Sequence, residues 1–382
     1  MFLEYQSPKK IEQYKQKLKL IGSLSRLFSE KPIPYIQYRI AENLFCNVFE
    51  ADNRSRSDLS ADATISNLGF GIKTFGTNSK TSIEKIAEFD AQGLELRKLH
   101  DKPKELAFLL AKSRNDRLIF TKNTYNLDQM IYHLVVRQDS SIALLEQRMD
   151  FISSYKIRII SAKSSGLRFE DGIHEYNFNF SKSTLQQKFE INNIIESIPI
   201  VILEDPFDVL MNLFKSYQFS PPRVEQRIDF VILPLYSTRR SDKVVPEKSG
   251  LNQWNAEGRV RNSREVYIPV PRKIYELKPN FFPNRLTEFE LILPNGSSLS
   301  AKICQDGGKA LMSNPNKALG DWLLDQVLRQ PKDQLITYHQ LAKLGIDCVR
   351  VTKLGYLKYS IDFQKVGKYE EFISGEFLDE NS

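Results

Sequence analysis

The sequence has few of the residues that build disulfide or metal scaffolds. It contains three cysteines, Cys46, Cys304 and Cys348, which lie far apart. Their number and spacing exclude a disulfide framework and a zinc site of the CxxC type, and they are typical of a protein of the reducing cytoplasm. The four histidines are scattered, so we expect no histidine-rich metal cluster.

Long apolar runs are also absent. No stretch approaches the roughly 18 apolar residues of a membrane span, and the first residues, MFLEYQSPKKIEQ, lack the apolar segment of a secretory signal. Glycine and proline, at 17 each, are too few for a collagen-like or low-complexity chain. The 41% of hydrophobic residues can form packed cores, and 382 residues are enough for two or three domains.

The basic excess is concentrated in one segment. The chain has 54 Lys and Arg against 47 Asp and Glu, a formal net charge of +7. Residues 239–273 hold nine basic and four acidic residues, and therefore carry most of this excess. Such a segment in a balanced chain suggests a polyanionic partner, most simply nucleic acid, although a solvated linker would have the same charge.

Residue periodicity divides the chain into two parts. The N-terminal part is expected to contain helices at 8–28, 35–50, 81–113 (broken near Pro103) and 205–217, a β-hairpin over 57–75, further strands within 117–180, and a buried strand at 228–236. The C-terminal part is mainly β, with helical stretches at 318–329 and 337–344 and a closing hairpin around Gly355. We place the boundaries at 1–236 (with a strand-rich region of uncertain role at 115–236), a linker or basic arm at 237–258, a domain at 259–366 and an acidic tail at 367–382.

The predicted hairpin carries a possible catalytic pair. In SADATISNLGFGIKTF, Asp62 lies on the first strand and Lys73 on the second. Metal-dependent phosphodiester hydrolysis requires carboxylates that hold Mg²⁺ and a cation near the attacking water and the scissile phosphate. The segment resembles the PD-(D/E)xK nuclease core of restriction endonucleases. In that family an acid stands two positions before the lysine, but this chain has Gly71 there, so its pattern is incomplete.

The second acid is then expected after the lysine strand, because some members of that family move it onto the following helix. Glu84 and Glu88 are four positions apart and would share one face of the helix expected there. Residues 81–84 (TSIE) match a capping box, which already accounts for Glu84. We therefore predict Glu88 as the second metal ligand, with Glu84 in reserve. The resemblance also implies Glu42, on the preceding helix, as a further acid at the metal site.

Other assignments remain open in this part. Asp58 could replace Asp62, although it follows a polar run that is typical of a loop. His100-Asp101-Lys102 matches the HxK element of phospholipase-D-type nucleases, which need no metal, but its context is helical and charged. His133, in MIYHLVV, is expected to be a sheet residue rather than a base.

The C-terminal part carries several motifs in order. Within 251–363 these are LNQWNAEGRVRNSREVYIPVPRKIYE, PNFFP, CQDGGKAL and NKALGDWLLDQVL. They resemble the B3-like DNA-binding pseudobarrel of certain type II restriction enzymes, a fold that plant transcription factors share. In that family two arms grip the major groove. Trp254 and Trp322 are expected to pack rather than to contact DNA.

The resemblance implies two groups of DNA-binding residues. The first arm would present Gln253, Asn255, Arg259, Arg261, Asn262 and Arg264, and the second Gln305, Asp306, Lys309, Asn314 and Asn316. Arg can pair bidentately with guanine and Asn or Gln with adenine, and the same side chains also hold phosphates. Two glycines in the second arm allow a close approach of the backbone.

Together these features predict a Mg²⁺-dependent type II restriction endonuclease of the bacterial cytoplasm. Its fold would be an α/β (α+β) restriction-endonuclease-like N-terminal domain followed by a mainly β, B3-like pseudobarrel. Asp62 and Glu88 would hold the metal, Lys73 would position the attacking water, and cleavage of double-stranded DNA would leave 5′-phosphate ends. Cutting both strands requires two active sites, so we expect a homodimer, with a cognate DNA methyltransferase as functional partner. A non-catalytic DNA-binding regulator and a modification-dependent nuclease are the alternatives.

Overall fold

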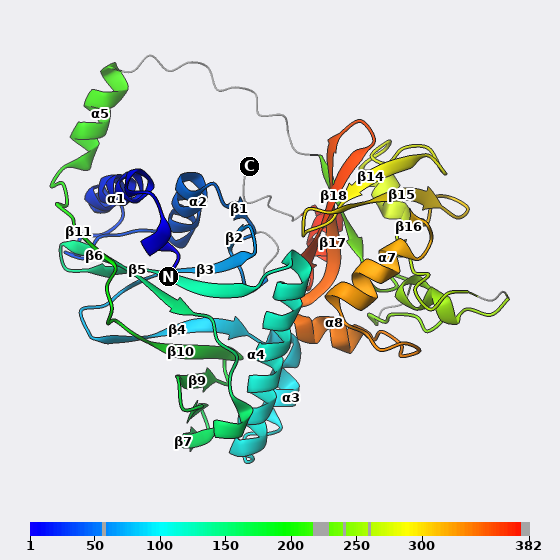
Figure 1. The fold of residues 1–382 in the computed structure, drawn as a ribbon, viewed down its shortest axis with the longest axis horizontal. Helices are drawn as coiled ribbons and strands as arrows, with labels where there is room; N and C mark the ends of the chain where they lie inside the picture. The colour runs from blue at the N-terminus through cyan, green and yellow to red at the C-terminus, as the bar shows by residue number, and fades with distance from the viewer. Residues whose placement is uncertain (56–58, 217–228, 240–241, 259–260, 376–382) are drawn as a thin grey trace. The chain divides into compact units, whose positions relative to one another are not determined.

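The chain forms two compact units. The computed structural model describes residues 1–55, 59–216, 229–239, 242–258 and 261–375 (Figure 1). Unit 1 comprises Met1–Leu118 and Leu127–Glu225, and unit 2 comprises Ile119–Asn126 and Gln226–Ser382. This division differs from the boundary expected at residue 236.

Unit 1 contains two sheets and most of the helices. The six-stranded sheet has the order β1 (Asp52–Asn53), β2 (Ala63–Ile65), β3 (Leu68–Gly76), β5 (Gln129–Gln138), β6 (Ser141–Arg148) and β11 (Glu196–Pro199). The five-stranded sheet has the order β4 (Thr81–Glu88), β10 (Thr184–Glu190), β9 (Glu175–Asn179), β8 (Gly166–Glu170) and β7 (Arg158–Lys163). The helices are η1 (Leu3–Tyr5), α1 (Pro8–Ser23), η2 (Ser25–Leu27), α2 (Tyr38–Phe49), η3 (Asp90–Gln92), α3 (Gly93–Arg97), α4 (Pro103–Tyr125, whose last residues group with unit 2), η4 (Ser154–Lys156) and α5 (Pro206–Ser216).

These elements form layers around the six-stranded sheet. Helices α1 and α2 cover one of its faces, and their apolar residues share a core with Phe70 and Ile72 of β3 (Figure 1). On the opposite face Phe75 lies 6.3 Å from Phe189 of β10, measured between ring centroids. Helices α3 and α4 form a second core with the five-stranded sheet. In β3 the pairing is parallel to β5 and antiparallel to β2.

Several elements predicted for unit 1 are confirmed. Helix α1 starts at Pro8, and the Ser7 hydroxyl accepts a hydrogen bond from the N–H of Lys10, as expected for an N-cap. The β2–β3 hairpin is confirmed, and so is α5, where the Asp205 carboxylate caps the N–H of Asp208 at 3.1 Å. The expected break near Pro103 is also confirmed, because α4 begins there.

Two predictions in this part were wrong. Residues 81–88 are not helical but form β4, which pairs with β10 along its whole length. Residues 117–125, read as a strand, are the last turns of α4. In both places the apolar pattern was short enough to fit either a helix or a strand, and tertiary packing decided between the two.

Unit 2 is built around one seven-stranded sheet. Its order is β12 (Phe230–Pro234), β17 (Ile346–Gly355), β18 (Lys358–Lys365), β14 (Glu288–Ile292), β15 (Ser298–Cys304), β16 (Ala310–Asn314) and β13 (Ile268–Pro269). The edge strands β12 and β13 lie next to each other, so the sheet nearly closes into a barrel. The helices are η5 (Gly250–Asn255), α6 (Arg272–Leu277), α7 (Ala318–Gly320), the π-helix η6 (Asp321–Val327), α8 (Tyr338–Leu344) and α9 (Lys368–Ser374).

The core of unit 2 confirms three further expectations. Trp322 is buried and stacks on Phe363 with ring centroids 5.7 Å apart. The closing hairpin is formed by β17 and β18, and the helical stretches at 318–329 and 337–344 appear as α7 with η6 and as α8. Strand β12, assigned from sequence to the N-terminal part, pairs with β17. Of the expected acidic tail, residues 376–382 lie outside the described residues.

Within the described ranges, no helix combines the length and the apolar character needed to cross a membrane.

Candidate nuclease and DNA-binding sites

A pair of carboxylates lies where β2 begins. Glu42 is on the core-facing side of α2 and is 5% exposed, and Asp62 directly precedes β2. Burial, and after it the negative charge of Asp62, raises the pKa of Glu42 to about 7, although Arg39, 3.2 Å away, opposes the shift. Burial also raises the pKa of the nearby Cys46 thiol to about 12, and both carboxylates contribute. The two acids therefore form one electrostatically coupled site.

Backbone pairing brings Asp62 next to the lysine strand. An Asp62 carboxylate oxygen accepts a hydrogen bond of 2.7 Å from the N–H of Ile72, the residue before Lys73. Strand β2 pairs with β3 only as far as Phe70. Beyond that residue, no described strand pairs with this edge of β3. The Asp62 carboxylate thus lies beside the backbone of Ile72, one residue before Lys73.

The Lys73 side chain extends from the face of β3 opposite to the α1–α2 core. Ile72 belongs to that core, and side chains alternate along a strand. The charge of Lys73 acts on Glu84, an acid of β4. Burial raises the pKa of Glu84, whereas the Ser82 hydroxyl and the positive charges of Lys73 and Arg137 oppose the shift.

Strand pairing explains why Glu84, and not Glu88, faces the lysine. Glu84 pairs with Gln187 of β10, on the same face as Phe189, which packs against the six-stranded sheet. A bulge lies between Glu84 and Glu88, and the Glu88 carboxylate is part-exposed and bonded to Lys85 at 3.0 Å. Because residues 81–88 form a strand, Glu84 and Glu88 do not share the helix face that was predicted for them.

The carboxylate pair suits a hard divalent cation. Mg²⁺ prefers oxygen ligands and is usually held by one or two carboxylates together with waters and substrate phosphates. Glu42 and Asp62 would supply two carboxylates to such a cation, whose positive charge would relieve the repulsion between them. In the part of the chain that the structure describes, no group of three or more His, Cys, Asp or Glu is placed to hold a metal. The alternative Asp58 lies outside the described residues.

The surroundings of His100 and His133 do not match those of a catalytic histidine. His100 is exposed in the turn between α3 and α4, with Asp101 and Lys102, and not on an apolar strand. His133 is fully buried on β5, where it bonds the Tyr14 hydroxyl at 3.0 Å and lies 3.5 Å from Glu146. It is the sheet residue that the sequence indicated.

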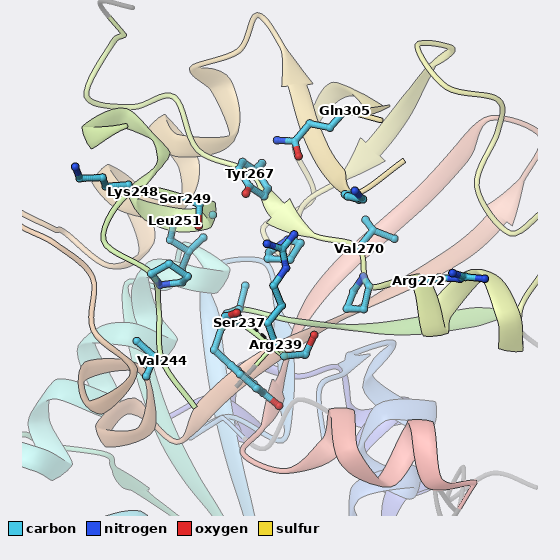
Figure 2. Close-up of a pocket in the computed structure, with 18 of the residues that line it drawn as sticks. Ser237, Arg239, Val244, Lys248, Ser249, Leu251, Tyr267, Val270, Arg272 and Gln305 are labelled. Atoms are coloured by element: carbon cyan, nitrogen blue, oxygen red, sulfur yellow. Dashed lines mark hydrogen bonds between the residues drawn. The ribbon is translucent and has the colours of Figure 1, made fainter. Parts of the chain in front are cut away.

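Unit 2 contains a large cleft with basic residues in its lining. The cleft has a volume of about 1090 Å³, and Tyr267 and Val270 are among the residues that line it. Four cationic side chains line it: Arg239, Lys248, Arg272 and Lys309. Figure 2 shows Lys248 and Arg272 on opposite sides of the cleft, with Tyr267 and Arg239 between them. Positive charges around a concave surface are typical of a site for a polyanion.

Two of these cations are available for phosphates. Neither Arg239 nor Lys309 has an ion-pair partner within the described ranges, and both are exposed. Lys248 pairs with Glu257, and Arg272 lies 3.3 Å from Glu276. Arg239, Lys248 and Arg272 were not nominated individually as DNA-binding residues, although the charge of segment 239–273 had pointed to them.

The expected second arm borders this cleft. Gln305, Gly307 and Lys309 line it from the turn between β15 and β16. Gly308 has φ +67°, and a Cβ on it would lie 2.5 Å from the Tyr275 hydroxyl, which donates to its carbonyl. This turn therefore requires glycine there.

Two other residues predicted for the second arm interact with acidic or basic side chains of unit 2. The exposed Asp306 bonds Arg285 at 2.9 Å, and Asn314 donates to Glu288 at 2.6 Å. Asn316 is half-buried.

The expected first arm is partly structural. The Arg264 guanidinium is buried and bonds the Gln330 carbonyl at 3.1 Å and Asp325 at 2.5 Å. Gln253 is also buried, and its carbonyl accepts a hydrogen bond from Arg261.

Asn255 and Asn262 are the exposed members of the first arm, and Arg259 lies outside the described residues. None of the first-arm residues that the structure describes lines the cleft, whereas Lys248–Leu251, just before them, do.

Comparison with known families supports this interpretation of unit 2. Residues 225–354, about a third of the chain, match the family model of the NgoFVII C-terminal B3-like DNA-binding domain. No curated protein sequence matches the chain. The match and the nearly closed, mainly β sheet agree with each other, and they support a C-terminal domain that binds specific DNA sequences, of the kind found in a restriction enzyme.

Proposed function

We propose that this chain is a type II restriction endonuclease that hydrolyses double-stranded DNA at or near a specific sequence, depends on Mg²⁺ and leaves 5′-phosphate ends. The observation that carries the proposal is the coupled Glu42–Asp62 pair, at the open edge of the Lys73 strand, in a chain whose other unit resembles a restriction-enzyme DNA-binding domain. A cognate DNA methyltransferase would protect the host DNA.

Glu42 and Asp62 would hold the metal. When bound, Mg²⁺ neutralises charge on the phosphate and lowers the pKa of a water ligand. The high pKa of Glu42 means that this carboxyl is partly protonated near neutral pH without a cation. Arg39, bonded to Glu42 at 3.2 Å, orients that carboxylate from the side of α2.

Lys73 would act on the phosphate and the water. Its ammonium would offset the negative charge that develops on phosphorus and orient the attacking water. Glu84 is the acid that stands near Lys73, so we propose it in place of Glu88 as the acid that completes the site. Glu84 would then replace the acid that the resembled family carries two positions before the lysine, where this chain has Gly71.

The basic cleft of unit 2 would bind DNA. Arg239 and Lys309 would contact phosphates, which position the duplex without reading its sequence. Gln305 is the exposed amide that lines the cleft, so we propose it for base contacts, with Asn255 and Asn262 as further exposed amides.

Cleavage of unmethylated phage DNA tests the proposal. Discrete fragments are expected in Mg²⁺ and none in EDTA. Lys73→Ala and Asp62→Asn should each lower the rate at least a hundredfold, because each removes a charge at the reacting phosphate. Lys85→Ala is the matched control: it also removes a lysine, but an exposed one that is bonded to Glu88.

Other outcomes would point elsewhere. Fragments that persist in EDTA would refute the metal site and return attention to His100. Tight DNA binding without cleavage would favour a non-catalytic regulator, for which the missing acid at Gly71 is the structural argument. Cleavage restricted to methylated DNA would identify a modification-dependent nuclease.

A further inference from the structure

Helix α5 exposes an unusually apolar surface. Phe207, Val209, Met211, Leu213 and Phe214 are all about half exposed or more, and the two phenylalanines are 63% and 59% exposed. Large side chains of this kind seldom cluster on the outside of a soluble monomer, and such patches usually mark an interaction site.

The helix is short, and little of it is buried. With eleven residues, α5 is shorter than helices that persist alone in water, which draw most of their stability from a buried apolar stripe. Of its residues only Pro206 is buried. Its start is secured locally by the Asp205 cap, and the preceding segment is tied to α1 by the hydrogen bond from the N–H of Leu203 to the Ser23 carbonyl. Helix α5 also contacts η2, yet its large apolar side chains stay exposed.

The charges on α5 indicate which partner fits. The helix carries one acid, Asp208, and one base, Lys215, so it has no net charge to attract DNA. The two residues are seven positions apart and lie on the same side of the helix. When two copies pack antiparallel about a twofold axis near Met211, Asp208 of each copy faces Lys215 of the other, and Phe207 faces Phe214.

We propose that α5 is the homodimer contact of this protein, packing antiparallel against α5 of a second copy. The choice of a second copy rests in part on the proposed function, because cutting both DNA strands requires two active sites. A parallel arrangement would oppose like charges at both positions, so the charge pattern favours the antiparallel one. Asn212 and Ser216 complete the polar side of the helix.

Sedimentation velocity of the full chain without DNA tests the contact. The wild type should be dimeric at micromolar concentration, and Phe207→Ser with Phe214→Ser should make it monomeric. Asp208→Lys should weaken association about tenfold, because both attractions at the rim become repulsions. Adding Lys215→Asp to that variant restores opposite charges across the axis and should restore the dimer. Leu94→Ser, which removes another exposed apolar side chain elsewhere in unit 1, is the control.

The results separate this proposal from the nuclease assignment. A wild type that stays monomeric, or a dimer that the α5 substitutions leave unchanged, would overturn the contact even when cleavage is intact. A monomer that the phenylalanine substitutions destabilise would also overturn it, since α5 would then pack within its own chain. A dimer that depends on α5 but cuts no DNA would support the contact and refute only the proposed nuclease activity.

Discussion

The buried carboxyl of Glu42 should make unit 1 sensitive to pH and to Mg²⁺. Its pKa is raised from 4.5 to about 7, first by burial and then by the charge of Asp62. Because the folded state holds the proton more tightly than the unfolded state, the extra stability is present below the unfolded pKa and is lost as pH rises toward 7. At 1.36 kcal/mol per pH unit, the loss between pH 4.5 and 7 is about 3 kcal/mol.

Substitution of Glu42 by Gln removes the titrating group and keeps the shape. Above pH 7 the variant avoids the cost of an ionised, buried carboxylate, about 3 kcal/mol, a figure that already includes the favourable effect of Arg39. We therefore expect Glu42→Gln to be more stable than the wild type by about 3 kcal/mol at pH 8 without metal. Its stability should also change little between pH 5 and 7.

Added Mg²⁺ should reverse the order of the two proteins. A cation that binds the ionised pair stabilises the folded wild type by about 4.1 kcal/mol when its concentration is a thousand times the Kd. Glu42→Gln retains only the Asp62 carboxylate and should gain far less. The prediction thus tests the metal site without any DNA.

The measurement must report on unit 1. Both tryptophans, Trp254 and Trp322, lie in unit 2, so their fluorescence follows the other unit. Hydrogen exchange of backbone amides in α2, followed by mass spectrometry at pH 5 to 8 with the intrinsic rate corrected, gives the local opening free energy. Glu88→Gln is the matched control because that carboxyl is part-exposed and bonded to Lys85. The reasoning fails when wild-type protection does not decline with pH, or when Mg²⁺ protects Glu42→Gln as much as the wild type.

The remaining predictions concern unit 2. Lys309→Ala should lower the slope of log K for DNA binding against log salt by about one, as measured by fluorescence anisotropy, because one phosphate contact is lost. Lys273→Ala, a basic residue of the same half that does not line the cleft, should leave the slope unchanged, and an equal effect would contradict the placement of DNA in the cleft. Gly320→Ala should destabilise unit 2 by about 3 kcal/mol in urea unfolding followed by tryptophan fluorescence, because its Cβ would lie 1.9 Å from the Arg264 carbonyl oxygen. Gly355→Ala meets nothing within 4 Å, and a similar loss there would show that close packing is not the cause.

Sequence alone determined those features that depend on short-range chemistry or on a long ordered pattern. Ser7 and Pro8 mark the start of α1 because a cap and a fixed φ act within one turn. The order of motifs in the C-terminal part indicated a B3-like domain, and the match over residues 225–354 supports it. The sign of the charge in segment 239–273 likewise needs no structure, since it depends only on composition.

Tertiary structure decided the roles of individual side chains. Glu84 and Glu88 fit one face of a helix by spacing, but an eight-residue segment also suits a strand, and pairing with β10 turned only Glu84 toward Lys73. Arg264 and Lys309 carry the same charge in the sequence. Only folding buried the first against Asp325 and left the second exposed at the cleft, because burial and ion pairing depend on residues far away in the chain.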